Sequence, residues 1–251
     1  MDSIIELRDI RKSFGDQHVL RGLSLAVRPG SVTVIIGRSG GGKSVFLKHI
    51  IGLMKPDSGQ VLVDGQDTVP LSERQMSPVR RKFGMLFQEA ALFDSMTVAE
   101  NVAFPLVEHT KLPGREIQQV VEAKLASVGL GGMGYKMPSE LSGGMRKRVG
   151  LARAIALDPK IVLFDEPTSG LDPVMSANIN ELILQTRDEF GATCVVISHD
   201  IQATFAIADE IFMLYDGQII ASGPPEAIRE SDNPVVRQFI RGEARGPITI
   251  A

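Results

Sequence analysis

The sequence predicts an α/β fold in which a mainly parallel sheet is interrupted by a helical insertion. Strand-like and helical patterns alternate over residues 3–63 and again over residues 161–197. The stretch between them, residues 89–158, is rich in helical periodicity instead. Alternation of this kind is typical of a parallel sheet covered by helices, and a helical stretch inside it indicates an inserted subdomain.

The first alternating region contains the most strand-like run of the chain. Residues 32–36 are mostly β-branched and stop abruptly at Gly37, as a buried strand does. A glycine-rich loop follows, and the apolar spacing after it predicts a helix over residues 43–54. Further short strands are expected at residues 4–7, 23–27 and 60–63.

The middle and the second alternating region continue the pattern. Apolar residues at helical spacing predict a helix over residues 116–128, and Gly129 marks its end. A strand is expected at 161–164, a helix at 174–189 and a strand at 194–197. The last stretch, from Pro234 to the end, predicts a short helix followed by an extended tail.

The composition excludes some classes of protein and leaves others open. Lysine and arginine number 27 and aspartate and glutamate 30, so the net charge is −3. This balance does not favour a nucleic-acid partner, which needs concentrated positive charge. The single cysteine, Cys194, lies in an apolar run, so we expect a packed side chain and a reducing compartment. No apolar segment approaches the roughly 20 residues of a membrane span, so another chain is expected to supply any span.

The first chemical motif is the loop Gly37-Arg38-Ser39-Gly40-Gly41-Gly42-Lys43-Ser44. Glycines let successive backbone N–H groups converge on an anion, and the N-terminus of the following helix favours phosphate. Lys43 is expected to contact the β- and γ-phosphates of a nucleotide, and Ser44 to ligate Mg²⁺. The alternative is a chance glycine-rich turn, but the strand before the loop and the helix after it favour a phosphate-binding loop.

The second motif ends the predicted strand at residues 161–164. Asp165 and Glu166 follow that strand directly, at the sheet edge where α/β proteins bind ligands. Asp165 is expected to orient Mg²⁺, and Glu166 to accept a proton from the attacking water. Strand ends are often acidic, so this motif alone does not indicate catalysis. Together with the phosphate-binding loop, it does.

The third motif, Leu141-Ser142-Gly143-Gly144, precedes an amphipathic helix. Ser142 is suited to cap that helix, and the glycines leave its N–H groups open to another anion. One nucleotide already has its phosphate loop. A second phosphate-binding helix end therefore makes sense if it serves the ATP of a second copy of the chain.

With these three motifs in order, the sequence resembles the ATP-binding-cassette (ABC) ATPases over nearly its whole length. The resemblance implies further roles: Phe14 stacks on adenine, Gln88 contacts Mg²⁺ and the attacking water, Asp172 lies in a loop at the dimer interface, and His199 contacts the γ-phosphate. For Phe14, a place in the core is the alternative. Met145 and Val45 depart from the residues, Gln and Thr, that many relatives have there.

The motifs and the resemblance together imply an ATPase with ATP and Mg²⁺ as cofactors. The expected catalytic residues are Glu166, His199, Gln88 and Lys43, and the expected metal ligands are Ser44, Gln88 and Asp165. The expected ATP contacts are Phe14, Gly37, Ser39, Gly40, Gly41, Gly42, Lys43, Ser44, Val45, Gln88, Ser142, Gly143, Gly144, Asp172 and His199.

The resemblance also implies a domain plan within the α/β class. It is a P-loop NTPase fold with an ABC ATPase core, an N-terminal antiparallel β subdomain and a helical insertion subdomain. The whole chain, 1–251, is then one nucleotide-binding domain. Its expected parts are a RecA-like core with the β subdomain at 1–88 and 159–235, a helical subdomain with the signature motif at 89–158, and a C-terminal tail at 236–251.

Within the ABC family, the sequence resembles the ATPases of the bacterial Mla phospholipid transport systems in four places. These are the segment at 83–106, the loop with Val45, the run ending at Met145 and the stretch at 236–242. This implies a second copy of the chain, a membrane permease, an MCE-domain lipid-binding protein and a small accessory cytoplasmic subunit as partners, with no nucleic acid. It also implies a place on the cytoplasmic face of the inner membrane. An importer of amino acids or other small solutes is the alternative. The end of the chain, from Glu243 to Ala251, either packs on the neighbouring copy or an accessory subunit, as the resemblance implies, or is disordered.

Overall fold

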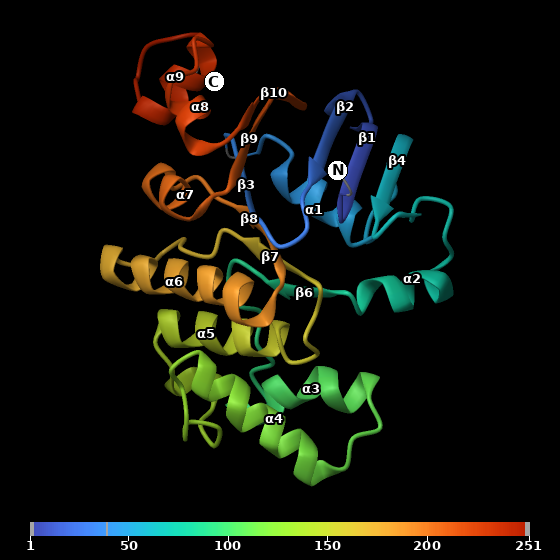
Figure 1. Cartoon of the computed structure of the whole chain (residues 1–251), viewed down its shortest axis with the longest axis vertical. Helices are drawn as coiled ribbons and strands as arrows, with labels where there is room; N and C mark the ends of the chain where they lie inside the picture. The colour runs from blue at the N-terminus through green and yellow to red at the C-terminus, as the bar shows by residue number, and fades with distance from the viewer. Residues whose placement is uncertain (1–2, 39, 249–251) are drawn as a thin grey trace. The chain divides into compact units, whose positions relative to one another are not determined.

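The computed structural model describes residues 3–38 and 40–248 of the chain. The chain forms two compact units. The first unit comprises Met1–Arg80 and Val195–Ala251, and the second comprises Arg81–Cys194. Each unit is described separately below, with the helices and strands labelled as in Figure 1.

The first unit begins with an antiparallel sheet in the strand order β2-β1-β4-β5. Apolar residues that alternate along β1, such as Ile5 and Leu7, point into the core and are buried, as the period of a half-buried strand requires. Gly15, with φ +57°, lies in the tight turn between β1 and β2, where Phe14 pairs with Gln17. The strands span β1 (Ile5–Phe14), β2 (Gln17–Val27), β4 (Ser58–Val63) and β5 (Gln66–Asp67).

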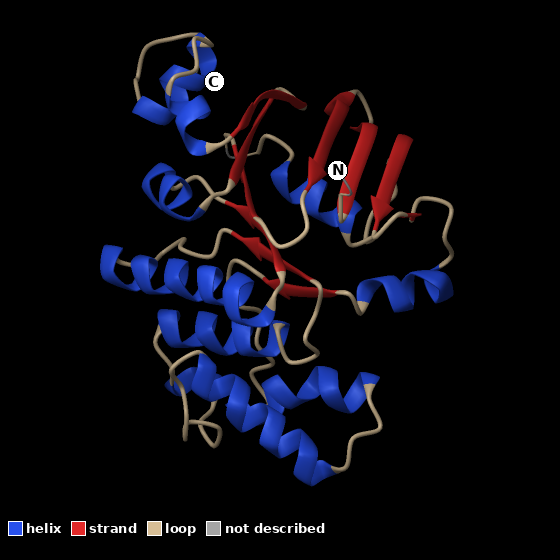
Figure 2. Ribbon diagram, viewed as in Figure 1, coloured by secondary structure: helices blue, strands red, loops and turns tan. Residues whose placement is uncertain are grey.

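The second sheet of the first unit has the strand order β10-β9-β3-β8. Its inner strand β3 (Val32–Ile36) is buried at every residue and runs parallel to β9 (Glu210–Tyr215). The strand at 32–36 is confirmed at both ends. The remaining strands are β8 (Thr193–Ile197), which crosses the boundary between the units, and β10 (Gln218–Gly223). Figure 2 shows the strands and helices of each unit by colour.

Five helices belong to the described part of the first unit: α1 (Lys43–Ile50), α2 (Glu73–Arg80), α7 (Ile201–Ile207), α8 (Pro225–Arg229) and α9 (Pro234–Arg241). The predicted end of α1 at residue 54 is wrong. Gly52 has φ +67°, and its N–H donates to the His49 carbonyl, so the chain leaves the helix after Ile50.

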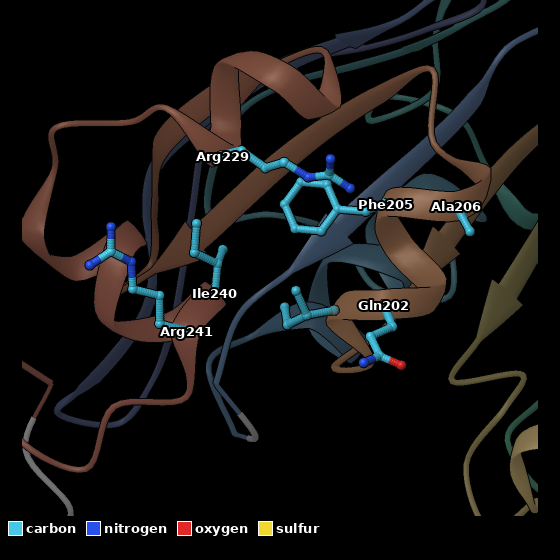
Figure 3. Close-up of a pocket in the computed structure, with 7 residues that line it drawn as sticks. Gln202, Phe205, Ala206, Arg229, Ile240 and Arg241 are labelled. Carbon is cyan, nitrogen blue, oxygen red and sulfur yellow. The ribbon is translucent and has the colours of Figure 1, made fainter.

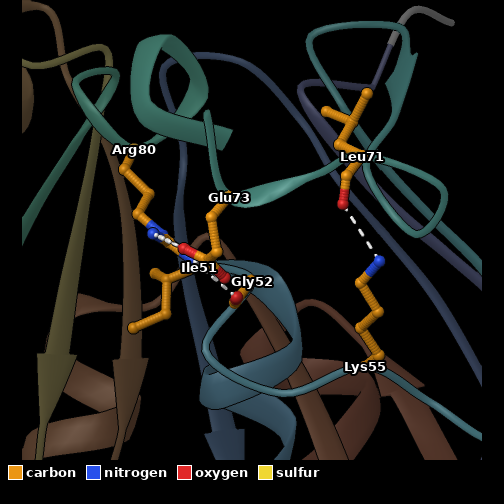
Figure 4. Close-up of polar contacts among 6 residues, drawn as sticks. All are labelled: Ile51, Gly52, Lys55, Leu71, Glu73 and Arg80. Atoms are coloured by element: carbon orange, nitrogen blue, oxygen red, sulfur yellow. Dashed lines mark hydrogen bonds and ion pairs between the residues drawn. The ribbon is translucent and has the colours of Figure 1, made fainter. Parts of the chain in front are cut away.

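Arg80, the last residue of α2, fixes the chain that follows α1 (Figure 4). Its guanidinium donates to the carbonyls of Ile51 and Gly52 at 3.2 and 2.9 Å. It also forms an ion pair with Glu73 at 2.7 Å. These two carbonyls lie just beyond α1, so Arg80 stabilises the turn that follows the helix.

The second unit combines two parallel strands with a helical group. β6 (Phe83–Leu86) pairs with β7 (Ile161–Asp165), and Leu86 lies opposite Phe164. Helices α3 (Val98–His109), α4 (Gly114–Ser127) and α5 (Gly143–Ala154) pack on one another, with a 3-10 turn at Pro138–Glu140. The long helix α6 (Pro173–Phe190) packs on α5 (Figure 1). The expected helix-rich middle and the strand after it are thus present.

Two further expectations concern single segments. Cys194 is buried in β8 and its thiol lies 3.7 Å from the Ile183 carbonyl, as expected for a packed cysteine. The expected extended tail is wrong for residues up to Ile248. The side chain of Gln238 in α9 accepts from the N–H of Ile248 at 2.6 Å and donates to the carbonyl of Glu243, so the chain folds back on α9. Within the described residues, no helix is long and apolar enough to cross a bilayer.

Candidate functional site

The glycine-rich loop connects the buried strand β3 to α1 in the first unit. Gly37 has φ +153°, and a Cβ at this position would lie 2.2 Å from the Leu214 carbonyl oxygen, so only glycine fits there. Lys43, at the start of α1, is 5% exposed, and its ammonium donates to the carbonyls of Gly37 and Arg38 at 2.8 Å each. The lysine therefore points back along the loop.

The N-terminus of α1 is open to an anion. Gly42, its N-cap, has φ +94° and supplies no side-chain cap, so no side chain of the cap residue covers the first-turn amides. Ser44 is exposed in this turn and Val45 is half-buried. Gly40 and Gly41 border a cavity of about 280 Å³ beside the loop. Ser39 lies outside the described residues.

Two more predicted residues lie in the first unit. Phe14, at the end of β1, is 46% exposed, so the alternative that it belongs to the core is wrong. Its ring face lies 5.7 Å from the Lys12 ammonium. His199 is exposed directly after β8, and the N–H of the preceding Ser198 donates to the Ile35 carbonyl of β3 at 3.2 Å.

In the second unit, the two acidic residues lie at the C-terminal end of β7. Asp165 and Glu166 are both half-buried. Glu166 has φ +49°, a left-handed conformation that costs a non-glycine residue about 1–3 kcal/mol. The N–H of Ser169 donates to the Glu166 carbonyl at 3.1 Å and closes the turn. Backbone strain of this kind clusters at functional sites, which fits a catalytic role for the carboxylate.

Gln88 lies just after β6, the strand next to β7. Its side-chain amide donates to the Ser169 hydroxyl at 3.4 Å. Asp172 caps α6 by accepting from the N–H groups of Val174 and Met175 at 3.0 Å each. The structure therefore brings Gln88 next to the loop that joins Glu166 to α6.

The third motif forms the start of α5, as expected. Ser142 is the N-cap, and its hydroxyl accepts from the Met145 N–H at 3.3 Å. Ser142 and Gly143 are exposed, whereas Gly144 is buried under the Met175 side chain of α6. A Cβ on Gly144 would lie 2.1 Å from the Met175 Cε, so a larger residue here would displace the end of the Met175 side chain.

The predicted residues thus form two groups, each inside one unit. The first unit holds the phosphate-binding loop with Lys43 and Ser44, together with Phe14 and His199. The second unit holds Gln88, Asp165, Glu166, Asp172 and the Ser142-Gly143-Gly144 run.

Comparison with known proteins decides the family. The sequence profile of the ABC transporter family matches residues 20–169. The chain belongs to the ABC transporter family. It is an ATP-binding subunit of this family and hydrolyses ATP.

Curated relatives of this ABC ATPase extend over almost its whole length. It is 47% identical, over 97% of the chain and 68% of the relative, to a probable ribonucleotide transport ATP-binding protein, mkl, of Mycobacterium tuberculosis. It is 44% identical to the intermembrane phospholipid transport system ATP-binding protein MlaF of Haemophilus influenzae, over 98% of the chain and 93% of the relative. It is 43% identical to MlaF of Escherichia coli K12, over 98% of the chain and 91% of the relative.

Solved structures confirm the fold. A dimeric structure of a post-hydrolysis state of the ATP-binding cassette MJ0796, bound to ADP and Pi, matches with a TM-score of 0.81 and 32% identity, covering 88% of this chain and 98% of that one. The cbiO1 protein of Clostridium perfringens, part of the ABC transporter complex cbiONQ, matches with a TM-score of 0.84 and 31% identity, covering 97% and 100%.

Sequence reasoning missed the residues that fix the segment after Gln88 in this ABC ATPase. Arg153 of α5 donates to the carbonyls of Ala90 and Ala91 at 2.7 and 2.8 Å. These two alanines have φ +60° and +46°, so the turn is strained and needs support. Asn101, which is buried, binds both backbone groups of Phe93. A helical pattern alone cannot show that Arg153 turns inward.

A larger cavity of the first unit, about 480 Å³, lies among α7, α8 and α9 (Figure 3). Apolar and basic side chains line it, and the Arg229 guanidinium lies 4.5 Å from the Phe205 ring centroid. None of the predicted nucleotide contacts belongs to its lining. The lining residues are Ile201, Gln202, Phe205, Ala206, Arg229, Ile240 and Arg241.

Proposed function

We propose that this ABC ATPase powers phospholipid transport in a bacterial cell envelope, as two copies that bind ATP head-to-tail beneath a membrane permease. The observation that supports this best is the similarity to MlaF, which extends over 98% of the chain at 43–44% identity and over more than nine-tenths of the relatives. Those relatives are named intermembrane phospholipid transport ATP-binding proteins. The dimeric form of MJ0796 supports the pairing of two copies.

In this proposal, each ATP contacts residues of both copies. The phosphate-binding loop of one copy, with Lys43, binds the β- and γ-phosphates, and His199 contacts the γ-phosphate. Ser142 and Gly144 of the other copy close the site, because the exposed N-terminus of α5 favours an anion. Glu166 accepts the proton of the attacking water. Catalysis then rests on positioning and on stabilising charge on the transferred phosphoryl group.

The chain offers a suitable set of ligands for Mg²⁺. Mg²⁺ prefers oxygen ligands and keeps several waters. We assign the Ser44 hydroxyl, the Gln88 side-chain carbonyl and the Asp165 carboxylate to the metal. The ion would supply charge neutralisation at the phosphates, and these residues would hold it in place. Ser44 is exposed and Asp165 is half-buried, so both oxygens are reachable for a hydrated ion.

The segment around Gln88 and the helix α3 that follows it support a permease partner. Phe87, Phe93 and Phe104 are 40%, 41% and 36% exposed, although they are large apolar residues. The rings of Phe93 and Phe104 lie 4.8 Å apart. Arg153 and Asn101 hold the backbone beneath Phe93 in place. Exposed apolar side chains on a rigid support are typical of a docking surface for another protein.

The remaining partners and the place in the cell follow from the same similarity. We infer an MCE-domain lipid-binding protein and a small accessory subunit as further partners, and the cytoplasmic face of the inner membrane as the place of work. The division into 1–88 with 159–235, 89–158 and 236–251 stays a proposal. So does a role of the tail after α9 in contacts with a neighbouring subunit.

A second candidate is import of small polar solutes. The relative mkl, at 47% identity, is named for probable ribonucleotide transport, and this favours a solute class that includes nucleotides. The ATPase mechanism is the same for both candidates. They differ only in the membrane subunits that the ATPase drives.

The partners and cargo decide between the candidates. The chain would be tagged at its natural locus, its complex extracted from native membranes in mild detergent, and the co-purifying proteins and lipids identified by mass spectrometry. Phospholipid transport predicts a permease, an MCE-domain protein and enriched phospholipid. A permease with a soluble solute-binding protein and no enriched lipid would contradict the phospholipid proposal and support import.

A further inference from the structure

Lys147 is a buried lysine in the middle of α5 that the nucleotide motifs leave without a role. It is 5% exposed. Its ammonium donates to the carbonyl of Pro167 at 2.7 Å and to the carbonyl of Ser169 at 2.6 Å. Both acceptors are backbone carbonyls, so Lys147 holds the backbone of a loop and does not pair with a neighbouring side chain among the described residues.

The loop that Lys147 holds starts directly after Glu166. The Ser169 N–H donates to the Glu166 carbonyl at 3.1 Å, and the Ser169 hydroxyl accepts from Gln88 at 3.4 Å. The Lys147 ammonium therefore contacts the backbone of a turn in which Ser169 is hydrogen-bonded to both Glu166 and Gln88. Because Glu166 has the strained φ of +49°, its backbone needs support from outside the turn.

Burying this ammonium costs stability, so its place in the fold suggests a role beyond packing. Burial lowers the pKa of Lys147, and the carboxylates of Glu89 and Glu166 act in the opposite direction. A charged group that leaves water needs good hydrogen bonds in return. Lys124 of α4 shows the ordinary arrangement in the same unit. It is 7% exposed and forms an ion pair with the exposed Asp158, which lies outside the loop that joins Glu166 to α6.

We propose that Lys147 is a positioning residue for ATP hydrolysis, which holds the loop at 167–169 so that Glu166 and Gln88 keep their places. The inference rests on the proposed role of Glu166 as the base. Lys147 lies in the helix that begins at Ser142. A shift of α5, when its N-terminus receives the ATP of the other copy, would therefore move the loop that carries the base. Lys147 thereby links closure of the site to proton transfer.

The test compares Lys147→Met with Lys147→Arg and the matched control Lys124→Met, in the full chain. The readouts are kcat, KM for ATP, ATP affinity and melting temperature. We expect Lys147→Met to lower kcat about 10- to 100-fold, since small misplacements of catalytic groups have effects of this size. ATP affinity is expected to stay within about twofold, because the phosphate-binding loop is unaltered. Lys147→Arg keeps donors for both carbonyls and is expected to restore most of the rate.

Three outcomes would overturn the inference. One is a Lys147→Met variant with the kcat of the wild type. Another is a loss of kcat that Lys124→Met matches at an equal loss of melting temperature, because that result indicates general destabilisation. A third is a Lys147→Arg variant no faster than Lys147→Met. If Lys147→Met does not fold, Lys147→Gln takes its place under the same criteria, because its shorter, uncharged amide does not replace the two charge-assisted hydrogen bonds.

A Glu166→Gln variant measured alongside separates this inference from the function on which it rests. Turnover near the wild-type rate in Glu166→Gln would show that Glu166 is not the base, and it would overturn the inference as well. A nearly inactive Glu166→Gln together with an unaltered Lys147→Met would overturn only the role of Lys147.

Discussion

At the scale of single residues, the most informative position is Glu166. It combines a half-buried carboxylate at the end of β7 with a left-handed backbone. A non-glycine residue keeps such a conformation only where its surroundings enforce it. In this chain the Ser169 N–H donates to the carbonyl of Glu166 itself, and the Lys147 ammonium donates to the carbonyl of the next residue, Pro167. The strain therefore serves to aim the side chain.

Replacing this carboxylate is expected to separate binding from chemistry. Glu166→Gln keeps the size of the side chain and removes its basicity, so turnover is expected to fall about 10²- to 10⁴-fold, the usual contribution of general-base catalysis. ATP affinity is expected to stay close to that of the wild type. Steady-state hydrolysis and equilibrium ATP titration measure the two quantities. Hydrolysis near the wild-type rate would show that another group is the base.

His49 in α1 is expected to make stability depend on pH. It is 1% exposed, its Nδ1 lies 2.6 Å from the Val45 carbonyl, and its Nε2 has no partner among the described residues. Burial lowers its pKa; the Val45 carbonyl and Asp57 oppose this shift, whereas Lys12 adds to it. The unfolded chain then binds a proton more readily than the folded one. The stability due to neutral His49 is complete above its unfolded pKa of about 6.5 and is lost as the pH falls from there towards the lower folded value.

The matched measurement is urea unfolding at about pH 8 and about pH 5.5, on either side of the usual histidine pKa. His49→Leu is expected to lose less stability between these values than the wild type. His109→Leu serves as the control, because His109 is exposed. An equal loss in His49→Leu and the wild type would contradict the assignment.

At the scale of elements, helix ends decide the chemistry. The N-terminus of α1 is proposed to bind the phosphates of one ATP and lacks a side-chain cap, whereas that of α5 has Ser142 as a cap and is exposed. Glycine lies close to each end: Gly37 before α1 has no room for a side chain beside the Leu214 carbonyl, and Gly144 in α5 packs under the Met175 side chain. The two helices therefore offer similar anion sites, which suits one ATP held between two copies.

A bulky charged residue at the start of α5 is expected to block hydrolysis without blocking binding. Ser142→Arg fills the exposed helix end that is proposed to receive the other copy's ATP. ATP still binds to the unaltered phosphate-binding loop. Ser142→Thr is the control, since threonine also caps a helix. Hydrolysis and ATP titration are measured for both variants, and full hydrolysis in Ser142→Arg would rule out this contact.

The aromatic pair of Phe93, before α3, and Phe104, in the middle of α3, is expected to matter only in the assembled transporter. Phe104→Ser removes one ring of the exposed pair with Phe93. Recovery of the membrane subunit with the tagged chain is expected to fall, while ATP binding of the isolated chain is unchanged. Tyr135→Ser, at a residue that is 76% exposed elsewhere in the second unit, is the control. Equal recovery with Phe104→Ser and Tyr135→Ser would contradict docking at this pair.

At the scale of the whole molecule, the sequence predicted the elements with the strongest patterns and missed those set by tertiary contacts. The strand at 32–36 was predicted to the residue, because every position is buried and glycine ends it. The end of α1 was predicted too late because Leu53 continues the apolar spacing, yet it is 60% exposed. The fold-back of the tail depends on the side chain of Gln238, which has no local pattern.

The candidate site follows the same division. Its motifs were readable because glycine, lysine and acidic residues occur at fixed spacing around a strand or a helix start. Lys147 and Arg153 were not, because lysine and arginine on a helix usually face water. What turns them inward is the set of backbone carbonyls of loops that lie 20 or more residues away in the chain, at Pro167 and Ala90.

Two copies of the chain are proposed to enclose ATP between them, and the association state of Glu166→Gln reports on this pairing. This variant would be examined by sedimentation with and without ATP and Mg²⁺, with Lys43→Ala added to the same variant as the control that cannot hold the phosphates. We expect the mass to double with ATP and to remain that of one copy without ATP or in the Lys43→Ala control. A single copy at saturating ATP, with binding verified by titration, would contradict it.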